Sequence, residues 1–109
     1  MKRSEDLAEE IDDPKLIASV FIQSAYIKSG MGDHDDAEEV VRKAIEVAKK
    51  SKMLRELANA YYLLGDILRE LRREKEATRS LEDALALFRR FKDEGMTKRL
   101  ASELTNLRK

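Results

Sequence analysis

The sequence predicts an all-α protein built from antiparallel helical hairpins stacked as a short right-handed solenoid. Apolar residues recur at spacings of three and four along most of the chain, as in Leu54, Leu57, Ala58 and Tyr61. No run alternates apolar and polar residues as a strand would. Similar residues also recur forty positions apart, which indicates stacked repeats. The recurring pairs are Ala18/Ala58, Phe21/Tyr61, Gly32/Arg72, Ala37/Ala77, Val41/Leu81, Ala44/Ala84 and Ile45/Leu85.

The first predicted elements are a short N-terminal turn and a full helix. Residues 4–12 are expected to form one or two helical turns. Forty residues later, the equivalent positions form the end of the second helix. Asp13 followed by Pro14 is typical of an N-cap and a first helical residue, so a helix is expected over 14–29. Its apolar stripe is expected to face the core and comprises Leu16, Val20, Phe21, Ser24 and Ile27.

The next two helices are separated by short polar turns. Gly30-Met31-Gly32 ends the helix before them. Asp33 and Asp36 resemble an acidic capping pair for a helix over about 34–50. Ser51 can cap a third helix over about 52–71.

The last two helices complete a single domain. A fourth helix is expected over about 75–91, and Asp93 to Gly95 interrupts the pattern. Thr97 can then cap a final helix. Because the connections are short, consecutive helices should be antiparallel neighbours. The expected parts of the domain, residues 1–109, are repeat 1 at 14–50, repeat 2 at 52–91 and a capping helix at 97–107.

The second copy carries a recognisable pattern of small and large residues. Its first helix has Ala58, Tyr61, Leu64-Gly65 and Leu68, and its second helix has Ala77, Leu81, Ala84 and Leu85. This pattern resembles the tetratricopeptide repeat family, in which paired helices pack through small residues. The forty-residue spacing is longer than the family's commonest unit and resembles its subgroup with extended helices.

The first copy departs from that pattern at two places. Ser24-Ala25 stands where the family has Leu-Gly, and Lys28 stands where a large apolar residue is expected. In the second copy, Arg72 stands at the turn position that is Gly32 in the first. If that position is left-handed, Arg72 is strained by roughly 1 kcal/mol.

The resemblance implies that the first helix of each hairpin lines a concave groove for a peptide or helix of a partner protein. Tyr62 is adjacent to the core residue Tyr61, so it should either face this groove or pack on the neighbouring hairpin. Arg69 is expected to meet an acidic side chain, and Leu63 is assigned to the same side. The expected partner-binding residues are Ser19, Ile22, Gln23, Tyr26, Asn59, Tyr62, Asp66 and Arg69.

A self-associating scaffold is the alternative function. The apolar stripe Leu100, Leu104 and Leu107 of the last helix could fold back as a cap or pack against a second copy. The two parts of the chain also differ in charge. Residues 1–50 hold 8 Lys/Arg and 12 Asp/Glu, a net of −4, whereas residues 51–109 hold 14 and 10, a net of +4. This polarity either favours end-to-end stacking or reflects local helix faces.

Several function classes are disfavoured by composition. Without Cys there is no thiolate metal site, and the lone His34 lies among aspartates explained by helix capping, so no metal or cofactor is expected. No catalytic motif is present, and an enzyme is not expected. The net charge of zero argues against a nucleic-acid binder, and no apolar run is long enough for a membrane span. A cytoplasmic protein is expected; its composition resembles that of a thermophile's protein, and a designed repeat or an excerpt of a longer solenoid would look similar.

Overall fold

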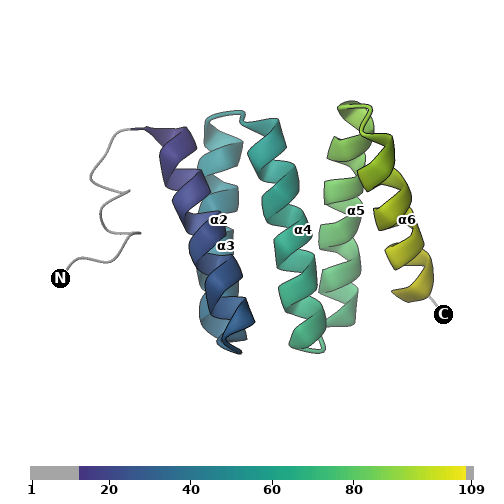
Figure 1. Cartoon of the computed structure of the whole chain (residues 1–109), viewed down its shortest axis with the longest axis horizontal. Coiled ribbons are helices and arrows are strands. Elements are labelled where there is room, and N and C mark those ends of the chain that lie inside the picture. The colour runs from purple at the N-terminus through teal and green to yellow at the C-terminus, as the bar shows by residue number, and fades with distance from the viewer. Residues whose placement is uncertain (1–12, 108–109) are drawn as a thin grey trace.

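The computed structural model describes residues 13–107, and these form five helices without a strand (Figure 1). The predicted turn at 4–12 lies outside the described residues. The all-α expectation is confirmed, and each helix end lies within three residues of its predicted place. The helices are α2 (Pro14–Gly30), α3 (His34–Lys50), α4 (Leu54–Glu70), α5 (Glu74–Arg90) and α6 (Glu94–Leu107).

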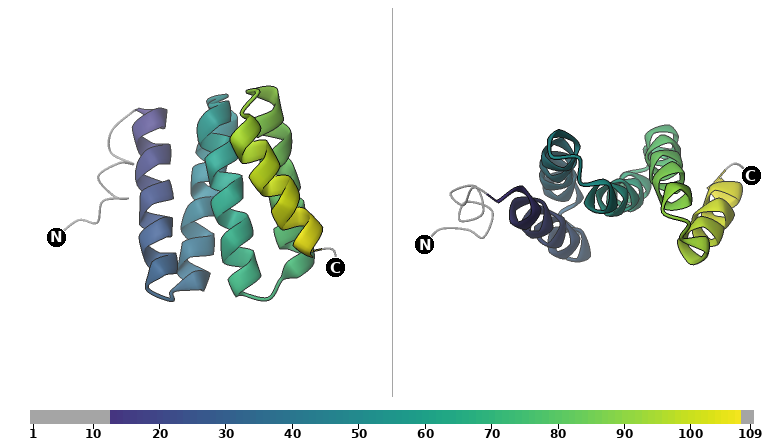
Figure 2. Two further views of the ribbon diagram at one scale, coloured as in Figure 1. Left: turned by 45° about the vertical axis from the view of Figure 1, so that its right-hand side comes forward. Right: turned by 90° about the horizontal axis from the view of Figure 1, so that it is seen from above.

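The helices are arranged in two layers. Seen from above, α2, α4 and α6 lie in one layer, and α3 and α5 lie in the other (Figure 2). Each helix packs against the next along the chain, and α2 also contacts α4. The helices therefore form two stacked hairpins, α2–α3 and α4–α5, followed by α6 at the C-terminal end of the stack.

The cap predicted for α2 is confirmed. The Asp13 carboxylate accepts hydrogen bonds from the backbone N–H groups of Lys15 at 3.1 Å and Leu16 at 3.3 Å, and Pro14 is the first helical residue. Asp33 occupies the N-cap position predicted for α3, but its side chain makes no cap bond. The cap predicted for α4 is wrong, because Ser51 ends α3 and Met53 precedes α4.

The start of α6 also differs from the prediction. The helix begins at Glu94, three residues before the expected 97, because Asp93 provides the cap: its Oδ1 accepts from the backbone N–H of Met96 at 3.1 Å. The Thr97 hydroxyl is not a cap. It donates back to the Asp93 carbonyl at 2.7 Å from within the first turn.

The turns between helices share one geometry. Each has a residue with positive φ, namely Gly32 (90°), Lys52 (54°), Arg72 (64°) or Lys92 (59°). In each turn the next N–H donates to a carbonyl five residues earlier, as Arg73 does to Leu68 at 2.9 Å. The left-handed conformation anticipated at Arg72 is thus present.

Small residues let the helices of each hairpin approach closely. Ala25 and Ala37 in the first hairpin, and Ala77 in the second, have no exposed surface, and Gly65 is buried. One core cluster joins α2, α3 and α4, and a second joins α4, α5 and α6. The expectation for Leu16 and Ile27 is wrong: they are 40% and 61% exposed rather than in the core.

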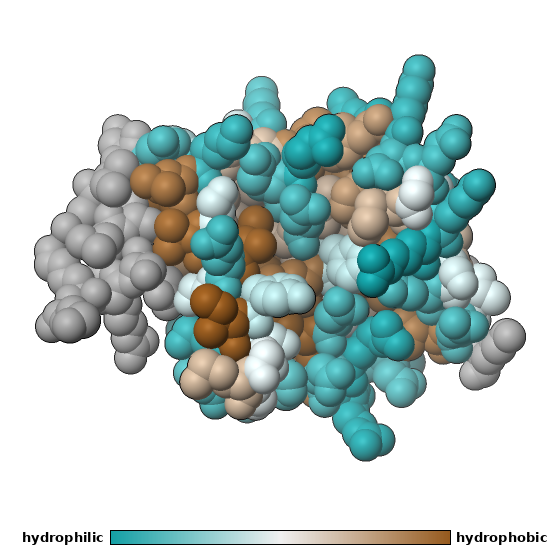
Figure 3. All heavy atoms as spheres, in the orientation of Figure 1, coloured by the Kyte–Doolittle hydropathy of each residue, from teal (hydrophilic) through white to brown (hydrophobic). Residues whose placement is uncertain are grey.

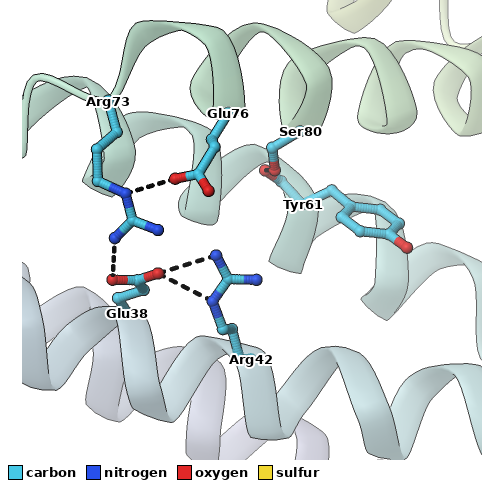
Figure 4. Close-up of polar contacts among 6 residues, drawn as sticks. All are labelled: Glu38, Arg42, Tyr61, Arg73, Glu76 and Ser80. Carbon is cyan, nitrogen blue, oxygen red and sulfur yellow. Dashed lines mark hydrogen bonds and ion pairs between the residues drawn. The ribbon is translucent and has the colours of Figure 1, made fainter.

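A network of charged side chains links the two hairpins beside the turn between α4 and α5 (Figure 4). Arg73 Nη1 lies 2.6 Å from Glu38 Oε1 of α3, and its Nε bonds to Glu76 of α5. Arg42 Nη2 lies 2.8 Å from Glu38 Oε2. Partial burial opposes ionisation of Glu38, but the bonds from Arg42 and Arg73 outweigh it and hold its pKa below the usual value.

Candidate functional site

The candidate site is the surface of the α2, α4 and α6 layer that faces away from α3 and α5. We call it the inner face, after the concave groove expected from the sequence. On α4, the residues Asn59, Tyr62, Asp66 and Arg69 are spaced by three and four and so share one side of the helix. Ser19, Ile22 and Tyr26 occupy the equivalent side of α2, forty residues earlier. The fold thus brings most of the predicted residues together from two neighbouring helices.

Tyr62 is held against α6. Its hydroxyl donates to Glu103 Oε1 at 3.0 Å, and the Arg99 guanidinium lies 5.8 Å from its ring centroid. Burial, followed by the bond to Glu103, raises the pKa of Tyr62 to about 12. The structure therefore has the second of the two arrangements considered for Tyr62, packing on the neighbouring element. The sequence reasoning did not include Arg99 and Glu103 in this face, although their i, i+4 spacing was visible.

Asp66 lies in a partly desolvated region that it shares with Glu103. Burial, followed by the charge of Glu103, raises the pKa of Asp66 to about 6. Arg69 offsets this only in part, because its Nη1 is 3.9 Å from Asp66 Oδ1 and both side chains are over 40% exposed. Glu103 Oε2 is buried and has no hydrogen-bond partner among the described residues. The carboxylates of Asp66 and Glu103 therefore lie close enough to repel each other, and Arg69 and Arg99 beside them compensate their charge.

A pocket of about 510 Å³ opens at the C-terminal ends of the three helices. Three carboxylates and one guanidinium line it, and the negative ends of the α2, α4 and α6 dipoles outnumber the positive end of the α5 dipole, which begins at Glu74. This combination favours a cation. Glu74 was not predicted for the site, and Leu107 was predicted only for the self-association stripe, because both come from elements outside the predicted groove. The lining residues are Ser29, Asp66, Arg69, Glu70, Glu74 and Leu107.

A second pocket of about 520 Å³ lies on the opposite side, between α3 and α5. Its floor includes Tyr61, whose carbonyl accepts a hydrogen bond from Ser80 Oγ at 2.7 Å (Figure 4). Three cationic and three acidic side chains surround it, so the charges of its lining cancel. These are Arg42, Lys49, Arg79, Glu46, Glu76 and Asp83.

One expectation about a neighbouring residue is wrong. Leu63 is only 8% exposed and packs in the first core cluster, so it does not face the groove. Gln23 occupies the equivalent position on α2, at the border of the inner face, and is exposed.

The self-association stripe of the last helix is not free. Leu100 has no exposed surface and Leu104 has 3%, because both pack in the second core cluster with Ala58 and Phe88. The helix therefore folds back as a cap, and the surface proposed for a second copy lies in the chain's own core. Leu107 is half-buried at the edge of the inner-face pocket.

The structure gives two further findings that bear on function. Within residues 13–107, no three His, Cys, Asp or Glu side chains lie close enough to hold a metal ion. His34 instead lies beside Ser29, with Nδ1 3.4 Å from Oγ. None of the helices in the described part of the chain is long and apolar enough to cross a membrane.

Two stacked hairpins with small residues at their contacts, closed by a further helix, define a helical-repeat protein. The model of the tetratricopeptide repeat family matches residues 16–90, which include nearly all of α2 to α5. The chain therefore belongs to the tetratricopeptide repeat family. Comparisons with curated proteins and with solved structures give no match. Repeats of this family generally mediate protein–protein interactions and are typically not enzymes.

Proposed function

We propose that this chain is a protein-interaction module that holds an extended peptide or a helix of a partner protein along the inner face. The observation that carries this proposal is the acidic pocket where α2, α4 and α6 end. The charged side chains of this pocket can bind one side chain of opposite charge, and so fix the position of a partner along the polar inner face.

The chemistry of the inner face suggests what the partner offers. Tyr26 is 71% exposed and provides aromatic contact area with a polar tip. Asn59 is exposed on the same face, nearer the start of α4, and can bond a peptide backbone, as can Gln23 at the border. Ser19 and Ile22 are partly buried and supply the surface between them.

The net negative charge of the pocket suggests a basic partner. The sequence reasoning expected Arg69 to meet an acidic side chain, but Arg69 has Asp66 beside it. With Glu70 and Glu74 also in the lining, the pocket favours a Lys or Arg side chain instead. The same charge repels phosphates, so a protein is proposed as the partner rather than a nucleic acid. We further propose a non-enzymatic, cofactor-free role, and a cytoplasmic location suited to a chain without cysteine.

A random-peptide display library panned on the immobilised chain tests this proposal. We expect the selected peptides to be enriched in Lys and Arg, and to bind the Glu70→Lys variant at least about tenfold more weakly, since one charge of the pocket is reversed. Glu39→Lys is the matched control, because Glu39 is an exposed acid on α3 in the other layer. Selected peptides that bind Glu70→Lys as well as the wild-type chain would contradict the proposal, as would a library that yields no binder.

A further inference from the structure

The helix α2 has an apolar stripe on the side opposite its core contacts. In the described residues, the large hydrophobic side chains with the greatest exposure all belong to α2 or the residue after it. These are Leu16 (40%), Tyr26 (71%), Ile27 (61%) and Met31 (72%). At 100° per residue, Leu16, Ile27 and Met31 lie with Val20 roughly opposite the buried Ala18, Phe21 and Ala25. Figure 3 shows hydrophobic surface gathered over α2, whereas α4 and α6 carry more hydrophilic side chains.

The second repeat shows what the equivalent positions do. Forty residues later, Ala60 and Ile67 take the places of Val20 and Ile27, and both have no exposed surface. They are buried in the core cluster that α4 forms with the α2–α3 hairpin. In the second repeat, this side of the first helix, α4, therefore packs on another helix. That helix is α3, which runs antiparallel to α4. On α2 the same side has no described helix against it.

The absence of charge on the α2 stripe limits which surfaces can cover it. The stripe includes Gln23 and is flanked by Ser19 and Ser24, so it carries no charge in a chain that is 40% charged. The other end of the stack does not match it, because α6 exposes polar residues, and head-to-tail stacking would bury them. The exposed residues of α6 include Lys98, Arg99, Ser102, Thr105 and Asn106.

Of the two ends of the stack, a second copy can therefore offer only its own α2. The helix α3, which covers the equivalent stripe of α4, is already buried in that contact. The positions 16, 20, 23 and 27 follow the 4–3–4 spacing of a coiled-coil seam. An uncharged stripe with this spacing is self-complementary about a two-fold axis, because no like charges meet across it.

We propose that two copies of this chain pair through α2, antiparallel about a two-fold axis, with Leu16 of one copy opposite Ile27 of the other. This reproduces the antiparallel contact that α3 makes with α4. A pair of 17-residue helices is only about 25 Å long. It buries less than the roughly 1,200 Å² of a standard interface, so the dimer is weak and reversible, with a dissociation constant of about 10–1,000 µM.

Sedimentation equilibrium of the full chain between about 10 µM and 1 mM tests this proposal. We expect a monomer–dimer equilibrium, and an increase of at least about tenfold in the dissociation constant for Ile27→Glu, which places two carboxylates at the seam. Ala86→Glu is the matched control and should leave the constant unchanged, because Ala86 is exposed on α5. Both variants should melt within a few degrees of the wild-type chain.

Three outcomes would overturn the dimer. They are a strict monomer at the highest concentration, equal weakening by both variants, or a marked loss of thermal stability in Ile27→Glu. The last result would mean that the chain's own first twelve residues cover the stripe. Peptide capture by the inner face should be unchanged in Ile27→Glu, so failure of the dimer and failure of the proposed peptide binding are separable.

Discussion

Gly65 and Leu81 face each other where α4 and α5 cross. A Cβ atom at Gly65 would lie 2.6 Å from Leu81 Cδ2 and 2.7 Å from its Cγ, which is closer than real contacts allow. The first hairpin has Ala25 and Val41 at the equivalent positions, and both have no exposed surface. A larger residue on one helix is thus matched by a smaller one on the other, and each hairpin has its own pair.

Gly65→Ala should destabilise the chain by up to about 2 kcal/mol, because overpacking against Leu81 costs about 1–3 kcal/mol and the gain in helix propensity returns only about 1 kcal/mol. Leu81→Val alone should cost about 1 kcal/mol through the space that it leaves. The double variant recreates the pair of the first hairpin. Urea unfolding should therefore show a favourable coupling of at least about 1 kcal/mol. Simple additivity would mean that the two positions do not interact.

Arg72→Gly should stabilise the chain by about 0.5–1 kcal/mol. The φ of Arg72 is 64°, and relief of left-handed strain, about 1–2 kcal/mol, exceeds the entropic cost of glycine, about 0.5–1 kcal/mol. Thermal melting measures the change. Gly32→Ala is the reciprocal control: Gly32 has a φ of 90° and open space around it, so a loss of stability there reports backbone strain alone. A melting temperature that falls in Arg72→Gly would contradict this account.

Asp66→Asn should stabilise the chain at pH 7–8 and have little effect near pH 4. Because burial and Glu103 raise the pKa of Asp66 to about 6, the folded state binds its proton more tightly than the unfolded state. The penalty for ionised Asp66 is thus fully present above pH 6 and is lost as the pH falls towards 4. Melting curves of both proteins across this range test the sign. A difference that grows as the pH falls would show that the environment of Asp66 is not desolvated.

Leu104→Ala should cost about 2–5 kcal/mol, since Leu104 is 3% exposed in the second core cluster. Chemical denaturation gives the change, and Asn106→Ala, an exposed change on the same helix, should be nearly neutral. Negligible destabilisation by Leu104→Ala would show that this side of α6 is not packed in the core.

The fold could be predicted from two kinds of sequence signal. The Asp13–Pro14 cap acts within one turn, and the pattern of small and large residues within each helix recurs forty positions later. The errors came from contacts between elements. Ile27 reads as a core residue from its spacing, but its burial depends on whether another helix lies over α2, as α3 does over Ile67.

The candidate site was predictable only in part for the same reason. Helical phase correctly grouped Asn59, Asp66 and Arg69 on one side of α4. The charge of the pocket depends on Glu74, which reaches it from α5, and the pKa of its lining residue Asp66 depends on Glu103 of α6. The position of α6 relative to α4 follows from packing at Leu100 and Leu104, and no local motif encodes it.

The most direct test of the proposed binding face is a two-dimensional NMR titration of the ¹⁵N-labelled chain with a Lys- or Arg-containing peptide from the display selection. The account predicts that the largest shift changes fall on the inner face, at Tyr26, Asn59, Asp66 and Arg69, and that α3 changes little. Changes concentrated on α3 and α5, around the pocket beside Tyr61, would contradict it.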